Sequence, residues 1–147
     1  NFNKTVEYNP NQSKWTCLFA QGFKRINRCK LQIKIDAINN AKNMFIGVAP
    51  GTYLEKDVCM REKGTIFYDC STGYILKNGE KDSTEPERSK SGDVILIAFD
   101  STSGFVTFWL NSEEIYRGKI DENDIDANLY YPCVHFYEKG DTVTISE

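Results

Sequence analysis

Apolar and polar residues alternate with a period of two along much of the chain, most clearly over residues 29–35. Leu31, Ile33 and Ile35 fall on one face of this segment, and polar residues fall on the other. Successive side chains of a β-strand point to opposite sides. The spacing therefore predicts a strand with one face on a core and one in water, at the surface of a β-sandwich.

A continuous apolar run at residues 94–99 predicts a central strand that is covered on both faces. The turn-forming residues 100–104 predict a hairpin loop into a second strand at 105–110. Phe105, Thr107 and Trp109 share one face of this second strand. Because the strand is strongly apolar, we expect Trp109 in the core.

Further short strands are predicted wherever β-branched and aromatic residues stand between turn residues. These are residues 5–8, 15–21, 44–49, 65–68, 74–77, 115–119, 129–136 and 142–146. Asn78 and Gly79 predict a tight turn because both tolerate positive φ, and residues 138–141 predict another. Residues 80–91 contain no aliphatic or aromatic side chain and are expected to form a solvated loop. About eleven strands without a helix predict an all-β protein, an antiparallel two-sheet β-sandwich.

Length and charge limit the domain organisation and the kinds of partner that we expect. A chain of 147 residues suits a single domain, and because it begins with Asn1 we expect it to be excised from a longer protein. Eighteen basic and 21 acidic residues give a net charge of −3, spread along the chain. This balance argues against a nucleic-acid partner. No run approaches the ~20 apolar residues of a membrane span, so no membrane partner is expected.

Five cysteines are present, an odd number without C-x-x-C spacing. We interpret them as reduced thiols of an intracellular, cytoplasmic protein, with no cofactor and no metal site, because zinc ligands normally come in closely spaced pairs. The acidic run at 121–126 invites a calcium interpretation, but it lacks the glycine and the distal glutamate of an EF-hand loop. We expect a solvated loop there.

Catalytic chemistry has little support in the sequence. His135 is the only histidine, and it stands between Val134 and Phe136 in a predicted strand. No nucleophile-elbow or phosphate-binding loop motif is present. We therefore expect no catalytic residues, no enzyme activity and a structural role for His135.

Several short segments, in a fixed order and spacing, carry a family resemblance. They are Phe45-Ile46-Gly47-Val48-Ala49, Gly64-Thr65-Ile66-Phe67-Tyr68, Gly73-Tyr74, Asn78-Gly79, Gly92-Asp93-Val94-Ile95, Phe99-Asp100, Gly104 to Asn111, Gly118-Lys119-Ile120 and Tyr131-Pro132-Cys133-Val134. With these segments the chain resembles a SPRY domain over nearly its whole length. Ser112 follows Asn111 where the family usually has glycine, so we expect a longer hairpin there. No preceding PRY-like extension is evident, and the subfamily stays unassigned.

The resemblance implies a bent, concanavalin-like jelly-roll sandwich and a non-catalytic protein–protein interaction module. Such a module binds a short peptide or a partner surface through loops at one rim, here residues 9–14, 50–63 and 137–141. Tyrosine offers large contact area at low entropic cost. The candidate partner-binding residues are the anchors Tyr53 and Tyr137, the charged Lys56, Glu138 and Lys139, and the polar Asn9.

Two other functions remain open at this stage. A carbohydrate-binding β-sandwich would need Trp109 to stack on a sugar, which its expected place in the core disfavours. An intramolecular docking domain of a larger protein would use the same loops as a partner-binding module. The isolated domain is expected to be a monomer.

Overall fold

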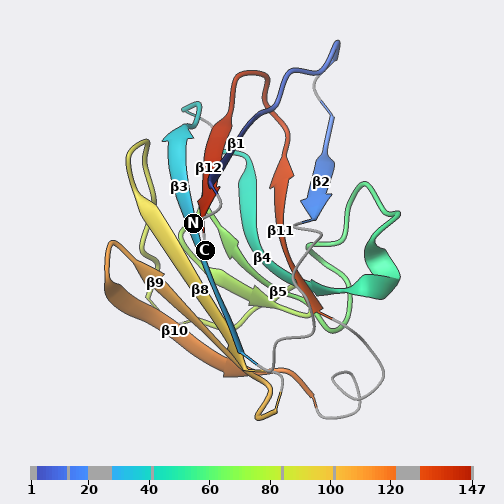
Figure 1. Cartoon of the computed structure of the whole chain (residues 1–147), viewed down its shortest axis with the longest axis vertical. Helices are drawn as coiled ribbons and strands as arrows, with labels where there is room; N and C mark the ends of the chain where they lie inside the picture. Colours follow the sequence, from blue (N-terminus) through green and yellow to red (C-terminus); the bar gives the residue numbers. More distant parts are fainter. Residues whose placement is uncertain are drawn as a thin grey trace.

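Two six-stranded antiparallel sheets stack face to face in the computed structural model of the chain (Figure 1). The structure describes residues 3–12, 14–19, 28–40, 42–83, 85–100, 102–121 and 130–146. Within these residues, no helix reaches the length and apolar character that a membrane crossing requires. The predicted all-β sandwich is confirmed.

The first sheet, sheet A, has the strand order β1-β12-β3-β8-β9-β10. Its strands are β1 (Asn3–Glu7), β12 (Thr142–Ser146), β3 (Arg28–Ala37), β8 (Val94–Asp100), β9 (Phe105–Leu110) and β10 (Glu113–Lys119). The alternation predicted for β3 is confirmed, since Leu31, Ile33 and Ile35 are buried and the residues between them are exposed. Asn3 pairs with Ser146, which brings the first and last described residues together.

The second sheet, sheet B, has the strand order β2-β11-β4-β5-β6-β7. Its strands are β2 (Thr16–Phe19), β11 (Tyr130–Phe136), β4 (Met44–Pro50), β5 (Ile66–Asp69), β6 (Ile75–Lys77) and β7 (Glu80–Lys81). The short 3-10 helix η1 (Gly51–Tyr53) follows β4 directly. Figure 1 shows β2 and β11 side by side at one edge of this sheet.

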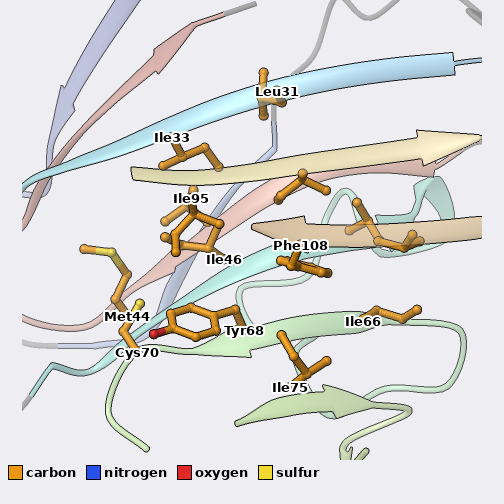
Figure 2. Packing of buried hydrophobic residues seen from close by; sticks show 14 of the residues in the cluster. Leu31, Ile33, Met44, Ile46, Ile66, Tyr68, Cys70, Ile75, Ile95 and Phe108 are labelled. Carbon is orange, nitrogen blue, oxygen red and sulfur yellow. The ribbon is translucent and has the colours of Figure 1, made fainter. Parts of the chain in front are cut away.

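The main core lies between the two sheets (Figure 2). Ile33 and Ile95 of sheet A and Ile46 and Tyr68 of sheet B are all completely buried. Each such side chain contributes about 1.5–3 kcal/mol by leaving water. The inward faces of all these strands therefore hold the sandwich together.

A second apolar cluster covers the outer face of sheet B, beneath the loop formed by residues 51–64. Its buried members are Phe19, Phe45, Ala49, Cys59, Met60, Phe67, Leu76 and Cys133. As a result, all seven residues of β4 are buried. β4 and β5, whose residues are all buried, are therefore covered on both faces.

The prediction of a doubly covered strand at residues 94–99 is wrong. In β8, Ile95, Ile97 and Phe99 are buried, whereas the residues between them are only partly buried. β8 is nevertheless central in sheet A, because β3 and β9 pair with it on either side. Its outer face lies beside the polar outer face of β3, and its outward residues are only partly buried.

The prediction that Trp109 lies in the core is also wrong. Val106, Phe108 and Leu110 take the inward face of β9, so Trp109 points outward and is half-buried. It stands opposite Leu96 on one side and Glu114 on the other. Both faces of β9 are apolar, and a period of two does not say which of two apolar faces turns inward.

Two loop predictions need correction as well. The hairpin after β9 is not longer: Leu110 pairs with Glu113 across a two-residue turn, in which Asn111 and Ser112 have φ of 50° and 75°. The expected solvated loop at 80–91 begins with the strand β7 and contains Ser89, which is fully buried. The tight turn at Asn78 and Gly79 is confirmed, with φ of 53° and 79°.

Candidate functional site

Four of the six residues predicted to bind a partner lie together at one end of the sandwich. Tyr137, Glu138 and Lys139 follow β11, and Asn9 follows β1. The two segments are tied by backbone hydrogen bonds beside these residues. Tyr8 N–H donates to the Asp141 carbonyl at 2.9 Å, and Gly140 N–H donates to the Tyr8 carbonyl at 2.8 Å. We call this group, with Trp15, the loop end of the sandwich.

Trp15 brings an aromatic surface to the loop end. Its ring lies 5.1 Å from the Tyr137 ring and 5.4 Å from the Phe45 ring, measured between centroids. Trp15 and Tyr137 are both half-buried. Sequence reasoning did not assign Trp15 to the site, although its position directly after the candidate loop 9–14 was the available signal.

Polar groups border this aromatic pair. Asn9 and Lys139 are exposed, while Glu138 is half-buried and accepts a hydrogen bond from Asn43 Nδ2 at 3.2 Å. The loop end thus offers two aromatic rings, an amide, a cation and a carboxylate within two adjoining turns. This set is able to bind a polar ligand that also carries an apolar group.

Tyr53 and Lys56 lie away from the loop end of the sandwich. Met44 pairs with Phe136 and Pro50 with Tyr130, so the chain leaves β4 at the opposite end of β11 from Tyr137. The seven residues of β4 span roughly 20 Å. The structure does not bring the start of this loop to the loop end.

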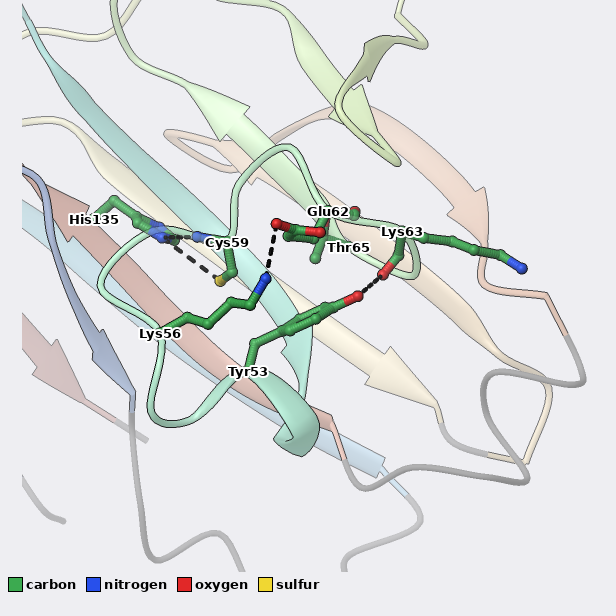
Figure 3. A network of polar contacts seen from close by, with 7 residues as sticks. All are labelled: Tyr53, Lys56, Cys59, Glu62, Lys63, Thr65 and His135. Carbon is green, nitrogen blue, oxygen red and sulfur yellow. Dashed lines mark hydrogen bonds and ion pairs between the residues drawn. The ribbon is translucent and has the colours of Figure 1, made fainter.

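The hydrogen bond of Tyr53 to Lys63 and the ion pair of Lys56 with Glu62 lie within the loop at residues 51–64 (Figure 3), and the Tyr53 ring packs against the apolar cluster on sheet B. Tyr53 Oη donates to the Lys63 carbonyl at 2.9 Å. Lys56 Nζ lies 3.0 Å from Glu62 Oε1 and 5.3 Å from the centroid of the Tyr53 ring. The hydrogen bond to Glu62 raises the pKa of the Lys56 ammonium. An exposed ion pair of this kind adds little stability. The hydrogen bond from the Tyr53 hydroxyl to Lys63 therefore contributes more to holding the loop closed than the Lys56–Glu62 pair does.

The same loop reaches over sheet B and buries a cysteine against the only histidine. Cys59 N–H donates to His135 Nε2 at 3.0 Å, and Cys59 Sγ lies 3.5 Å from that nitrogen. Cys17 is the cross-strand partner of His135. One side-chain donor atom from each of Cys17, Cys59 and His135 lies within 4.8 Å of the others. The structure thus brings together donors that are far apart in sequence.

Cys133 adds a third thiol to this group. It stands two residues before His135 on β11, on the same face of the strand, and the neighbouring thiols of Cys17 and Cys59 influence its pKa. Hydrogen bonds from Cys133 and Cys17 lower the pKa of the Cys59 thiol, whereas burial raises that of Cys133. Among Cys17, Cys59 and Cys133, Cys59 is the thiol whose pKa is lowered. Cys59 and His135 are 1% and 0% exposed, so the pair does not face solvent.

The other metal interpretation rested on the acidic run at 121–126. Of this run, the structure describes only Asp121, which is exposed. The remaining residues lie outside the described part of the chain.

The fold and the loop end together define an antiparallel β-sandwich domain that presents polar and aromatic side chains on its turns. The family model of the SPRY domain matches residues 28–147. The chain therefore belongs to the SPRY domain family, as its sequence motifs predicted. SPRY domains are generally protein-interaction modules.

Solved structures agree with this fold. The SPRY domain of human HERC1 is 20% identical with a TM-score of 0.72, and the match covers 97% of this chain and 87% of that one. A human SPRY domain is 14% identical with a TM-score of 0.74, covering 99% and 96%. The TRIM65 PSpry domain is 15% identical with a TM-score of 0.64, covering 89% and 70%. No curated sequence relative matches the chain.

Proposed function

We propose that this chain is a non-catalytic module that binds a short peptide or a partner surface at its loop end. The observation that carries the proposal is the Trp15–Tyr137 pair, two half-buried rings 5.1 Å apart at the end of the sandwich that also carries the exposed residues Asn9 and Lys139. Its general support is the protein-interaction role of SPRY domains.

Rigid placement makes this end suited to recognition. Trp15 directly precedes β2, and Tyr137 directly follows β11, the strand with which β2 pairs. Aromatic rings held in this way lose little conformational entropy when a partner binds. Asn9, Glu138 and Lys139 would then select the partner by hydrogen bonds and charge.

Tyr53 and Lys56 take a supporting role in this proposal. Tyr53 holds its own loop closed through the Lys63 carbonyl, and Lys56 pairs with Glu62. They would contact a partner only where that partner extends from the loop end along the outside of sheet B. We expect their removal to weaken binding less than removal of Tyr137.

A displayed library of random peptides, selected on the wild-type domain, supplies a defined ligand for the test. Affinity for the selected peptide is then measured for Trp15→Ala, Tyr137→Ala and Lys139→Ala. We expect at least tenfold weaker binding for the aromatic variants, or about 1.4 kcal/mol. Thermal melts show whether each variant is folded.

Phe105→Ala is the matched control. Phe105 is an aromatic residue that is 45% exposed on the outer face of sheet A, away from the loop end. Its removal should leave the affinity unchanged. Unchanged binding by a folded Tyr137→Ala variant would reject the site, and a Tyr53→Ala plus Lys56→Ala variant that loses binding first would move it to the loop at 51–64.

The proposal includes an intracellular location and a monomeric domain. Its support is that the four cysteines whose state is described, Cys17, Cys59, Cys70 and Cys133, are free thiols. Fractionation of cells that express the tagged parent protein tests the location, and sedimentation velocity of the purified domain tests the monomer. Recovery in the secreted fraction, or a dimer at micromolar concentration, would contradict these parts.

A further inference from the structure

We propose that Cys17, Cys59, Cys133 and His135 form a structural zinc site that fixes the loop at residues 51–64 to the outer face of sheet B. The four side chains come from β2, the loop and β11, which are three separate parts of the sequence. Tetrahedral sites with three thiolates and one imidazole are a common form of structural zinc.

The β2–β11 pairing explains how three of the donors reach one place. Cys17 stands directly opposite His135 in the antiparallel register, so both side chains leave the sheet on the same side. Cys133 lies two residues from His135 on the same strand and therefore points the same way, but its thiol lies outside the set of Cys17, Cys59 and His135 donor atoms that are all within 4.8 Å of one another. A shift of the Cys133 side chain would make it the fourth ligand. The side of the sheet on which these side chains lie is the outer face of sheet B, which the loop at 51–64 covers.

Cys59, which lies in the loop at residues 51–64, supplies the remaining donor. Its Sγ lies 3.5 Å from His135 Nε2 (Figure 3). Zinc–sulfur and zinc–nitrogen bonds of about 2.3 and 2.05 Å at a tetrahedral angle place sulfur and nitrogen about 3.6 Å apart. The observed separation thus already fits one edge of a zinc tetrahedron.

His135 is held in the tautomer that a metal on Nε2 needs. Because Cys59 N–H donates to Nε2, the ring proton must sit on Nδ1. Nδ1 is buried without a hydrogen-bond partner in the described structure. The Nε2 lone pair faces Cys59, and zinc would take this lone pair in place of the backbone N–H.

The chemistry of the donors selects the metal. Thiolate and imidazole ligands favour Zn²⁺ over Mg²⁺ or Ca²⁺, which prefer oxygen. Cys59 and Cys133 are each 1% exposed and His135 is 0% exposed, so the bound ion would be shielded from solvent. Such closed sites have structural rather than catalytic roles.

The first experiment uses the wild-type chain alone. Reduced protein is loaded with Zn²⁺, dialysed, and its metal content measured by plasma mass spectrometry, with a thermal melt before and after loading. We expect about one zinc ion per chain, and a melting temperature about 5–10 °C higher at a hundredfold excess of zinc over its Kd. Loading with Co²⁺ should give the visible absorption of a tetrahedral thiolate complex.

Cys17→Ser and Cys59→Ser test the ligands, and Cys70→Ser is the matched control. Cys70 is a buried free thiol in the main core, outside the group. We expect at least about tenfold weaker zinc binding for the first two variants and unchanged binding for the control. Cys17 is only half-buried, so its variant should fold even where Cys59→Ser does not.

Three results would overturn the proposal. The wild-type chain could stay free of zinc with an unchanged melting temperature. Folded Cys17→Ser protein could bind zinc as tightly as the wild type. Peptide mapping without reductant could instead show a disulfide among Cys17, Cys59 and Cys133 in protein that takes up no zinc, which would assign the group to redox chemistry.

Discussion

Ser112 occupies a backbone conformation that favours glycine. It has φ of 75° in the two-residue turn between β9 and β10, next to Asn111 at 50°. A side chain in the left-handed region costs roughly 1–2 kcal/mol, which asparagine partly avoids. We expect Ser112→Gly to stabilise the domain by about 1 kcal/mol, measured by urea denaturation.

Gly140 allows the opposite test, in which a glycine with positive φ is replaced by a residue that has a Cβ. It has φ of 91°, and a Cβ placed there would meet nothing within 4 Å. Gly140→Ala should therefore lower the stability by a similar amount through backbone strain alone. A destabilised Ser112→Gly variant would show that the turn is not strained at this position.

Asp141 should make stability fall as pH rises. The residue is 1% exposed, its Oδ1 accepts the Asn39 N–H at 3.0 Å, and its Oδ2 has no hydrogen-bond partner in the described structure. Burial raises the pKa of this carboxyl above its ordinary 3.8. Between 3.8 and the raised value the folded state holds the proton and the unfolded chain does not. The stabilising effect of protonation is thus lost across this window.

Asp141→Asn removes this titration while keeping an acceptor for Asn39. We expect the difference in unfolding free energy, wild type minus variant, to fall as the pH rises from about 4. Above the raised pKa of Asp141 this difference should level off. Urea denaturation of both proteins at several pH values measures this difference. A difference that stays constant, or that rises with pH, would contradict the prediction.

At the scale of single elements, β4 depends on Gly47. A Cβ at this position would lie 2.1 Å from the Ile66 carbonyl oxygen and 2.7 Å from Phe67 Cα, both backbone atoms of β5. Neither atom can move without separating two paired strands. We expect Gly47→Ala to cost about 3 kcal/mol or more, measured by urea denaturation, and exposed Gln32→Ala in β3 to cost less than about 0.5 kcal/mol. Equal stabilities would mean that β4 and β5 shift apart easily.

Most strands could be predicted from the sequence because side-chain direction follows directly from the extended backbone. The alternation at Leu31, Ile33 and Ile35 placed β3 and its inward face correctly. Alternation of apolar and polar residues does not predict the buried face where both faces of a strand are apolar, as in β8 and around Trp109 in β9. In these two strands of sheet A the inward face is set by pairing with the neighbouring strands and by packing against sheet B, and local sequence does not contain that information.

The candidate site was only partly predictable, for a similar reason. Asn9 and Tyr137 lie together because their turns adjoin at one end, as expected from the loops. Tyr53 does not, because β4 runs toward the opposite end. The contact between Cys59 and His135 joins positions 76 residues apart. It depends on strand register and on the path of a long loop, which spacing along the chain does not reveal.

At the scale of the whole molecule, the first two strands complete both sheets. β1 pairs with β12 at the edge of sheet A, and β2 pairs with β11 at the edge of sheet B. The match to the family model begins at residue 28 and so includes neither strand. We infer that the segment before residue 28 is nonetheless a structural part of this domain.

The two strands should differ in importance. β1 is mostly exposed, so its loss removes chiefly backbone pairing. β2 contributes Phe19, which is 8% exposed, and it covers the edge of β11, the strand that carries Cys133 and His135. Removing β2 would expose that edge together with the apolar cluster on sheet B, and an uncovered apolar strand edge promotes aggregation.

Two truncated chains test this difference. We expect a fragment of residues 8–147 to remain folded with a lowered melting temperature. We expect a fragment of residues 28–147 to bind a hydrophobic dye, to aggregate and to lose the cooperative melt, because sheet B then lacks both an edge strand and part of its outer apolar cluster. Circular dichroism melts and light scattering at equal concentrations measure this outcome. If the fragment of residues 28–147 melts cooperatively at the temperature of the full chain, β2 packs on a domain that is already complete, and the Cys17 ligand, the Trp15 anchor and the loop end would all rest on a dispensable segment.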